Sequence, residues 1–466
     1  MGSQIDPNGT PSRYDARVEH RDASGPDRTP PVNLSGRRLV HVANSDSELA
    51  RHLSGYLEAF TGEGLEVIGI SPPGPSVGRL ATLGLRHISL PSSSRPGSSG
   101  GDLVAVARLT RLLRRLRPDI VHTYQPGSAR LDRVAARTAG VPGIVNTVHD
   151  LDLDHDLDHD LDHDLDHDHD LDLGAGGAAR AGGAARAGGG AQNSAPLQSP
   201  RQSPRRASRY SFDRLVTACS QFELVRSPDD LAALTALGVP PARLVALGSG
   251  VDLGRFRPRR TTSDIARARS DLGVDPSAVV VGIVGRLVWQ NGYRELFSAA
   301  ERIRTLRPEV VFVMVGPDGA AVDALTPGDR ESASHIGNVV WAGHRHNMAD
   351  LYSGFDVFAQ LSYRSGLTRS AMEALACGLP IVATDVPGSR QIVSHEQNGY
   401  LVPVHDVDAL TEAVAGLAGD PARRGTMGAR SRARAEADFD GRRTVQITLD
   451  VYRRLPARRS PSPGRP

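Results

Sequence analysis

The chain has 466 residues, of which 39% are hydrophobic and 4% aromatic, and its formal net charge is +2. This length exceeds one ordinary domain core and predicts two domains. The apolar runs fall short of the roughly 18 residues that span a bilayer, and the balanced charge excludes the concentrated basic surface of a nucleic-acid binder.

The start of the chain and its cysteines indicate a compartment. The first residues lack the apolar stretch of a secretion signal. Cys219 and Cys377 lie far apart and have neither a metal-binding nor a redox spacing, which fits a reducing environment. The sequence therefore predicts a cytoplasmic protein.

In chain order, residues 1–36 come first; they are rich in Pro, Ser, Asp and Arg and show no periodicity. The end of the chain, residues 457–466, is similar. Both predict disordered tails. From Arg38, apolar strands alternate with amphipathic helices as far as the strand GIVNTVHD, and the pattern resumes later with DRLVTACS. Such alternation predicts a parallel sheet with helices on both faces. We expect a first Rossmann-like domain over residues 37–255.

Residues 151–207 interrupt this domain with a low-complexity insertion. Asp stands at every second position from Asp150 to Asp172, many of them beside His, and a Gly/Ala repeat follows. The charges repel each other and the Gly/Ala repeat cannot build a core, so we predict a disordered insertion. Its histidines could chelate a metal loosely, but the repeat implies no fixed geometry, and we predict no metal site.

A second alternating series runs from AVVVGIVGRL to the helix VDALTEAVAGLAG and predicts a second Rossmann-like domain over residues 256–438. Residues 439–456 are predicted to form a helix that packs back across the interface. The fold class is then α/β, with two doubly wound domains facing a cleft. Open α/β sheets bind ligands outside the carboxyl ends of their strands, so the cleft is the expected site.

Gly285 and Arg286 follow a predicted strand of the second domain. Glycine permits close approach of a ligand to the backbone, and arginine offers forked donors to phosphate oxygens. A structural turn explains the same residues equally well.

A second segment, SYRSGLTRSAMEALACG, runs from a Gly-containing loop into a helix that starts near residues 368–370. Free amides at such a helix start can hold a diphosphate. Glu373, one turn further on, could accept hydrogen bonds from both hydroxyls of a ribose. Alternatively, Ser370 and Glu373 fit the S-x-x-E capping box, in which Glu373 only closes the start of the helix.

Three longer segments follow one another along the chain: GSGVDLGRFRP, then GIVGRLVWQNGYRELFSAAERI, then ATDVPGSRQIV. On these motifs the chain resembles the retaining family-4 glycosyltransferases over most of residues 38–455 outside the insertion, most strongly in the second half. The resemblance implies a GT-B fold with an acceptor-side first domain and a donor-binding second domain. It implies transfer of a sugar from a nucleotide diphosphate sugar to a sugar or lipid-linked acceptor, with retention of configuration and without a metal or other cofactor, in cell-surface polysaccharide or glycoconjugate synthesis.

The resemblance also implies roles for individual residues. His149 would lie near the transferred sugar and, with Glu373, act at the reacting centre; a strand-end histidine with a satisfied imidazole is the alternative for His149. His122 matches a position at the neighbouring strand end. The implied donor-binding residues are Gly285, Arg286, Asn291, Ser365, Gly366, Leu367, Ser370 and Glu373.

Two of these positions depart from the family, whose members usually carry Lys at the position of Asn291 and Glu at that of Ser365. Each lost charge-assisted hydrogen bond costs about 1.5–3 kcal/mol. We therefore expect weakened or altered donor use, and a catalytically weakened or inactive sugar-nucleotide-binding protein is the alternative. A sugar-nucleotide epimerase ranks last, because no carboxylate pair suits acid/base work at the sugar.

The predicted helix LVAVARLTRLLRRLRP is strongly basic. Its arginines are Arg108, Arg111, Arg114, Arg115 and Arg117. Relatives that act on lipid-linked acceptors dock similar faces on membranes, so the resemblance implies peripheral contact with the inner face of the membrane. A solvated helix face is the alternative interpretation.

Overall fold

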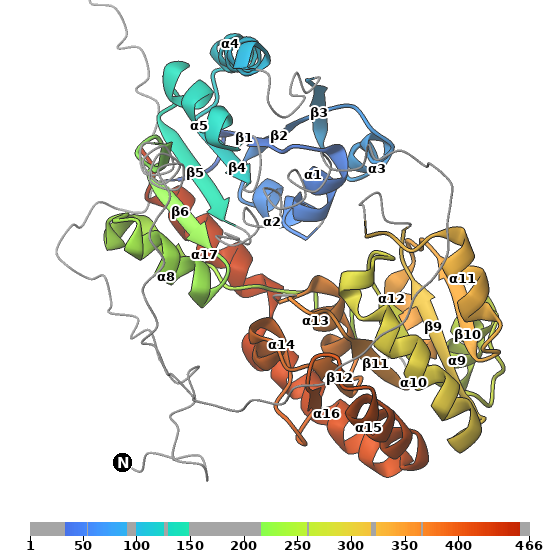
Figure 1. Cartoon of the computed structure of the whole chain (residues 1–466). Coiled ribbons are helices and arrows are strands. Elements are labelled where there is room, and N and C mark those ends of the chain that lie inside the picture. Colours follow the sequence, from blue (N-terminus) through green and yellow to red (C-terminus); the bar gives the residue numbers. More distant parts are fainter. Residues whose placement is uncertain are drawn as a thin grey trace, which may run out of the picture.

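The structure is a computed structural model that describes residues 33–53, 55–90, 99–124, 129–148, 216–258, 261–317, 323–364 and 367–456. It contains two α/β domains joined by two crossing segments (Figure 1). The predicted insertion and the end of the chain lie outside the described residues, as does the predicted first tail up to residue 32. Leu34, which the sequence assigned to that tail, is buried in the core of the first domain.

The first domain is built on a parallel sheet of seven strands in the order β3-β2-β1-β4-β5-β6-β7. The strands are β1 (Arg38–Val42), β2 (Glu66–Ser71), β3 (Arg86–Ser89), β4 (Ile120–Tyr124), β5 (Gly143–Val148), β6 (Phe222–Val225) and β7 (Leu244–Ala246). β4 and β5 are buried along their whole length. This burial is typical of parallel strands covered on both faces.

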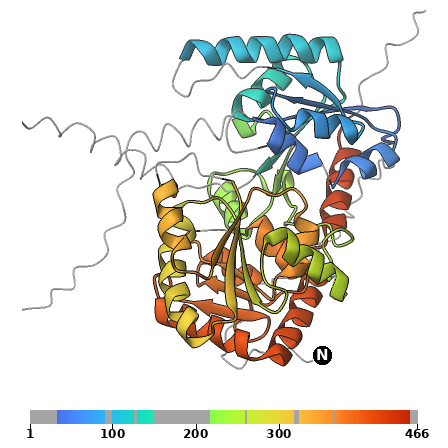
Figure 2. The same ribbon diagram turned by 90° about the vertical axis from the view of Figure 1, so that its right-hand side faces the viewer.

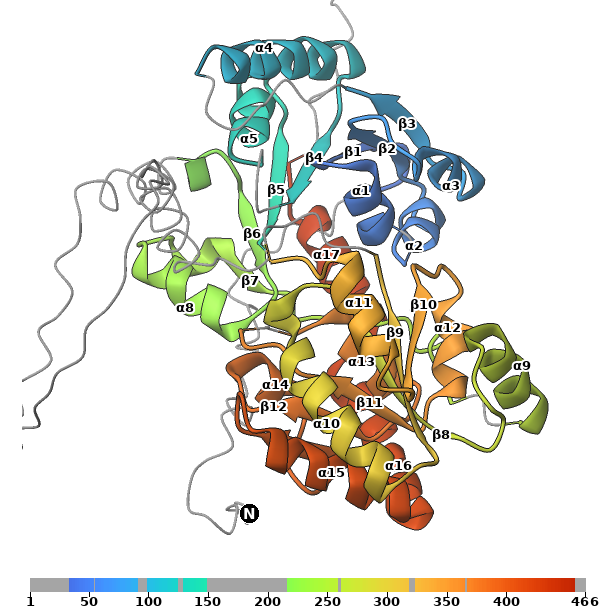
Figure 3. The same cartoon turned by 45° about the vertical axis from the view of Figure 1, so that its right-hand side comes forward.

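Helices cover both faces of the first sheet. They are α1 (Asp46–Leu53), α2 (Leu57–Gly62), α3 (Val77–Thr82), α4 (Ser99–Leu116), α5 (Ala129–Thr138), α8 (Pro228–Ala236) and the short η1 (Pro241–Arg243). The side chains of successive strand residues point to opposite faces of the sheet and pack in different cores. Leu39 packs with α1 and α2, whereas Val40 packs with α4 and α5. Figure 3 shows α4 and α5 above the sheet and α1 and α2 on its other side.

The second domain repeats the design with a six-stranded parallel sheet in the order β10-β9-β8-β11-β12-β13. Its strands are β8 (Val279–Val284), β9 (Val310–Val315), β10 (Val339–Gly343), β11 (Val357–Gln360), β12 (Ile381–Thr384) and β13 (Gly399–Val402). The predicted fold class is confirmed, since both sheets are parallel and both are covered by helices.

The helices of the second domain form two layers around its sheet. One layer consists of α9 (Thr262–Leu272), α12 (Met348–Leu351), η3 (Tyr352–Gly354), α13 (Arg369–Ala376), α14 (Pro387–Ile392) and α16 (Pro421–Asp438). The other consists of η2 (Trp289–Asn291), α10 (Tyr293–Leu306), α11 (Pro327–Ser334) and α15 (Val407–Gly419). Val280 and Val281 on β8 face these two cores in turn.

Helix α17 (Gly441–Arg453) leaves the second domain and packs against the first, where it appears in red beside the blue and cyan elements (Figure 2). Leu449 and Tyr452 are buried in the same core as Leu39. The predicted helix over residues 439–456 begins only at Gly441, because the Asp440 side chain accepts a hydrogen bond from the Arg442 amide and caps a new helix there.

The two segments that cross between the domains contact each other through their backbones. The Val251 amide donates to the Phe439 carbonyl at 2.9 Å, and the Gly441 amide donates to the Val251 carbonyl at 3.0 Å. A Cβ atom at Gly250 would lie 2.6 Å from the Gly441 Cα. Only glycine therefore fits at this crossing without a backbone shift.

Candidate functional site

The strand orders of the two sheets place the site. In each sheet the order reverses between two central strands, β1 and β4 in the first domain and β8 and β11 in the second. Ligands of doubly wound sheets bind outside the carboxyl ends of strands at such a switch point. Gly285 follows β8 directly, and the β11–α13 loop, residues 361–368, follows β11. The structure therefore brings the two predicted donor-binding segments to one edge of the sheet.

At the end of β8, the Gly285 amide donates to the Val315 carbonyl at 3.0 Å. The backbones of Gly316 and Gly285 lie close together, and it is Gly316 that must be glycine. A Cβ atom on Gly316 would lie 1.7 Å from the Gly285 carbonyl oxygen. A Cβ atom on Gly285 itself would meet only the Asn291 side chain, at 3.5 Å. Packing thus explains the glycine at 316 and leaves open space at 285.

Arg286 is exposed beside this open space. Among the described residues no group forms a hydrogen bond or ion pair with its guanidinium. The Asn291 side chain donates to the Arg286 carbonyl at 2.7 Å and so stabilises the turn that carries Arg286. Asn291 therefore has a structural contact at the position where the resemblance expects a donor-binding lysine.

The β11–α13 loop ends in a capped helix. The Thr368 hydroxyl accepts a hydrogen bond from the Ala371 amide at 3.3 Å, which makes Thr368 the N-cap of α13. The interpretation of Ser370 and Glu373 as a capping box is therefore wrong. Leu367 and Ser370 are half-buried, whereas Ser365 and Gly366 lie outside the described residues.

Glu373 is 9% exposed and is held on both of its oxygens. Arg369 donates through Nε to Oε1 at 3.1 Å, and the Tyr352 hydroxyl donates to Oε2 at 3.1 Å. Burial raises the pKa of Glu373, and the charge of Arg369 opposes this shift. Glu373 is thus a fixed acceptor. The i to i+4 spacing signalled its pairing with Arg369, but nothing in the sequence indicated Tyr352.

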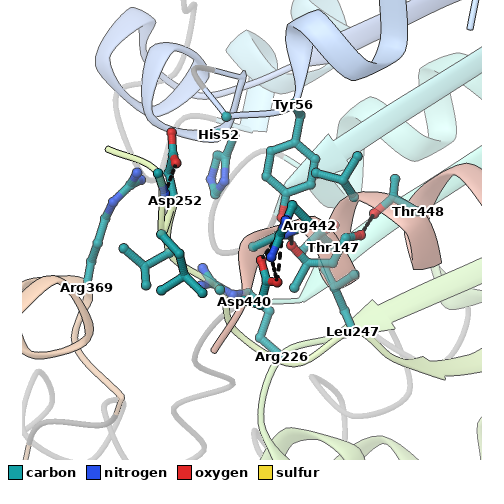
Figure 4. Close-up of a pocket in the computed structure, with 18 of the residues that line it drawn as sticks. His52, Tyr56, Thr147, Arg226, Leu247, Asp252, Arg369, Asp440, Arg442 and Thr448 are labelled. Carbon is teal, nitrogen blue, oxygen red and sulfur yellow. Dashed lines mark hydrogen bonds and ion pairs between the residues drawn. The ribbon is translucent and has the colours of Figure 1, made fainter. Parts of the chain in front are cut away.

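A cavity of about 620 Å³ lies between the domains. Figure 4 shows His52, Tyr56 and Thr147 of the first domain on its wall, together with Arg369 of the second. Arg369 therefore links the cavity to Glu373. The cavity lies in the predicted cleft between the domains, but most of its lining residues could not be predicted, because they come from segments spread over most of the chain.

The floor of the cavity carries paired charges and hydroxyl groups. Arg442 and Asp440 form an ion pair at 2.7 Å, and this contact lowers the pKa of Asp440. Thr444 accepts or donates a 2.6 Å hydrogen bond with the Tyr56 hydroxyl. Aromatic rings combined with a few fixed polar groups suit a polar organic ligand better than a metal ion or a long apolar chain.

His122 forms one wall of this cavity from β4. Its Nδ1 bonds to the Tyr452 hydroxyl at 2.5 Å and its Nε2 to the Thr147 hydroxyl at 2.7 Å. Burial lowers the pKa of His122 well below its ordinary value, so the ring is neutral at physiological pH. His122 thus connects β5 to α17. His149, which follows β5, lies outside the described residues.

The described part of the chain contains neither a candidate metal-binding cluster nor a candidate membrane-spanning helix. No group of three or more His, Cys, Asp or Glu side chains there is arranged to hold a metal ion. None of the helices described is both long and apolar enough to cross a membrane.

Comparisons with known proteins match both domains. Residues 48–250 match the family described as glycosyl transferase 4-like domain, and residues 278–420 match glycosyl transferases group 1. The structure of Anabaena HepE in complex with UDP and glucose superposes with a TM-score of 0.61 at 18% identity, covering 89% of this chain and 98% of that one. The chain therefore has the GT-B fold, and each of its two domains matches a glycosyltransferase family model.

Two sequence relatives have stated activities. A D-inositol 3-phosphate glycosyltransferase from Kribbella flavida is 35% identical over 230 residues, which cover 47% of this chain and 53% of the relative. A UDP-Gal:alpha-D-GlcNAc-diphosphoundecaprenol alpha-1,3-galactosyltransferase from Escherichia coli is 24% identical over 338 residues, which cover 72% and 76%. The chain thus spans about half the length of the first relative.

Proposed function

We propose that the protein is a glycosyltransferase that moves a sugar from a nucleotide diphosphate sugar to an acceptor with retention of configuration. The observation that carries this proposal is the contact of Arg369 with both Glu373 and the interdomain cavity. It puts a candidate ribose-binding carboxylate and a ligand-sized cavity side by side. The activities of the two sequence relatives and the UDP in the HepE structure support the same reaction class.

In this proposal the second domain binds the donor. Arg286, whose guanidinium has no partner among the described residues, binds the diphosphate, and the first amides of α13 add their dipole. Glu373 accepts hydrogen bonds from the ribose hydroxyls. The protein stabilises the charge that develops on the leaving diphosphate, and the departing phosphate oxygen takes the acceptor's proton. The scheme needs no metal or other cofactor.

The acceptor would occupy the cavity next to Arg369. Its wall of aromatic and hydroxyl side chains suits a hydroxyl-rich molecule, either a sugar or the head of a lipid-linked sugar. His149 would lie near the transferred sugar. We further propose a cytoplasmic enzyme of cell-surface polysaccharide or glycoconjugate synthesis, with peripheral contact at the membrane.

Isothermal titration with a panel of nucleoside diphosphates and their sugars, followed by donor hydrolysis, tests the proposal. We expect one donor to bind, and Arg286→Ala to weaken it by roughly 10- to 100-fold, the value of one charge-assisted hydrogen bond. Glu373→Ala should abolish turnover, and Ser365→Glu should increase it. Arg302→Ala, on the exposed surface of α10, is the control and should bind as the wild type does.

The outcomes separate the alternatives. Binding without hydrolysis or transfer to any acceptor would favour the catalytically weakened sugar-nucleotide-binding protein. Conversion of the bound sugar to its epimer would favour an epimerase. If no nucleotide binds, all three functions are wrong.

A further inference from the structure

Three side chains from separate elements of the second domain meet at the start of the β11–α13 loop. The Tyr363 hydroxyl, in the loop, donates to Oε2 of Glu295 on α10 at 2.7 Å. Nδ1 of His405, which lies between β13 and α15, is 2.7 Å from Oε1 of the same carboxylate. The rings of Tyr363 and His405 are also in contact, with centroids 4.4 Å apart. Both oxygens of Glu295 are thereby used.

The backbone around Tyr363 is tied to the same region. The Tyr363 amide donates to the Gln290 carbonyl at 3.0 Å. Gly292 has a φ of +76°, and a Cβ atom there would lie 2.3 Å from the Leu361 carbonyl oxygen. The segment that precedes α10 and the start of the loop therefore pack backbone to backbone, and Glu295 adds a side-chain bond at the same place.

His405 has an unusual backbone. Its φ of +66° lies in the left-handed region, which favours glycine. Such a conformation costs on the order of 1 kcal/mol and persists where the surroundings hold it. The bond from His405 to Glu295 is such a restraint. The imidazole is mostly exposed, so burial does not explain a histidine at this position.

The charge states are consistent with these bonds. Burial acts to raise the pKa of Glu295, but the hydrogen bonds from His405 and Tyr363 outweigh it and lower the pKa overall. Burial and the bond to Glu295 raise the pKa of Tyr363. A carboxylate can only accept hydrogen bonds, so both Tyr363 and Nδ1 of His405 donate to it.

We propose that Glu295, Tyr363 and His405 are positioning residues that hold residues 361–364 in place, so that Thr368 and the first amides of α13 meet the donor diphosphate correctly. This inference rests on the proposed function, because it assigns the loop to the donor. The three side chains act through the loop and do not touch the donor. Nothing in the sequence indicated them, since Glu295 and His405 lie 110 positions apart.

The experiment compares Glu295→Gln, Tyr363→Phe and His405→Gly with the wild type. The glycine suits the left-handed backbone, so it removes the imidazole without adding strain. Asp408→Asn is the matched control, because the ion pair of Asp408 with Arg302 also joins α15 to α10 but does not reach the loop. The readouts are hydrogen exchange of the Tyr363 amide without ligand, the Kd for UDP, and the melting temperature.

We expect the Tyr363 amide to exchange at least about tenfold faster in Glu295→Gln and Tyr363→Phe, and the Kd for UDP to rise about tenfold, with little change in melting temperature. The double variant Glu295→Gln with Tyr363→Phe should bind UDP no more weakly than the single variant that binds it less well. The reason is that both substitutions break the same hydrogen bond. His405→Gly should show a smaller effect in the same direction. Asp408→Asn should match the wild type throughout.

Unchanged exchange of the Tyr363 amide in Glu295→Gln and Tyr363→Phe would overturn the inference. Faster exchange with an unchanged Kd would overturn it too, because the loop would then be held without serving the donor. If the wild type binds no UDP or other nucleotide of the panel, the proposed function fails and the donor role fails with it. The exchange measurement alone still decides whether the three residues hold the loop.

Discussion

Glu373 lies buried between an arginine on its own helix and a tyrosine from η3. A carboxylate in such a place loses hydration, which raises its pKa, while the two donors keep it in a fixed orientation. The same two bonds leave free lone pairs on both oxygens. Glu373 therefore accepts hydrogen bonds from a ligand most strongly when it is ionised.

The affinity for UDP is predicted to depend on pH through Glu373. Its pKa is raised above the ordinary 4.5, so the carboxylate becomes neutral at a higher pH than an exposed one. As the pH falls through this raised pKa, the charge of the acceptor is lost and binding weakens. Titrations of UDP from pH 8 to 5 into the wild type and Glu373→Gln check this. The second phosphate pKa of about 6 affects both alike and cancels in the ratio of their Kd values.

We expect the wild type to bind about tenfold more tightly than Glu373→Gln at pH 8, and the two curves to converge at low pH. A ratio that stays constant over the whole range would mean that Glu373 does not titrate in contact with the nucleotide.

The positions of some candidate residues in the fold could be predicted from the sequence. Gly285 and Arg286 could be placed because a strand end is visible as the end of an apolar run. Tyr352 and His405 could not be found, because their partners Glu373 and Glu295 are distant in sequence and their contacts depend on how η3 and α15 pack. The alternative capping-box interpretation placed the cap of α13 at Ser370, but the cap is Thr368; two hydroxyl residues within one turn made the two positions hard to distinguish.

At the scale of the element, α4 combines exposed apolar and basic side chains. Leu103 is 74% exposed and Val104 is 46% exposed, while Arg108 and Arg111 are exposed further along the helix. A helix surface of this kind can lie at a membrane interface. Each arginine near an anionic surface contributes about 1 kcal/mol to binding.

We predict that the protein floats with vesicles that contain anionic lipid and does not float with neutral vesicles. Arg108→Gln with Arg111→Gln should weaken this binding by roughly 30-fold, the equivalent of about 2 kcal/mol. Arg302→Gln with Arg304→Gln on α10 is a matched control, because that helix also exposes a large apolar residue, Leu306. Equal flotation of both double variants and the wild type would show that α4 is a solvated face.

The elements themselves were largely readable from the sequence, because the strands of a covered parallel sheet are apolar runs and the helices repeat with a different period. The start of α17 was not. Residues 439–456 look helical throughout, but Phe439 is buried at the crossing and Asp440 caps the next helix. Where a helix is interrupted by packing between domains, local pattern carries no signal.

At the scale of the whole molecule, the domains are joined where two backbones touch. Gly250→Ala would place a Cβ atom 2.6 Å from the Gly441 Cα, and neither backbone can yield cheaply. We predict that this substitution lowers the free energy of unfolding by about 1–3 kcal/mol, as at other overpacked sites. Calorimetry should then show a melting temperature lowered by several degrees.

The control is Gly425→Ala on α16, where an added Cβ atom meets nothing within 4 Å. It should stabilise the helix by about 0.5–1 kcal/mol. If Gly250→Ala melts at the wild-type temperature, the crossing segments are not in tight contact and the cavity between the domains is free to change its width.

The burial of Tyr452 and Leu449 beside Leu39 affects how the protein folds during synthesis. The last strand of the first sheet, β7, leaves the ribosome about 200 residues before α17 is complete. At roughly 5–20 residues per second this gap lasts on the order of 10–40 s. During that time the part of this sheet face that α17 covers stays exposed, although α1 and α2 already cover the rest. The first domain is therefore exposed to chaperones and to aggregation until the second domain has been made.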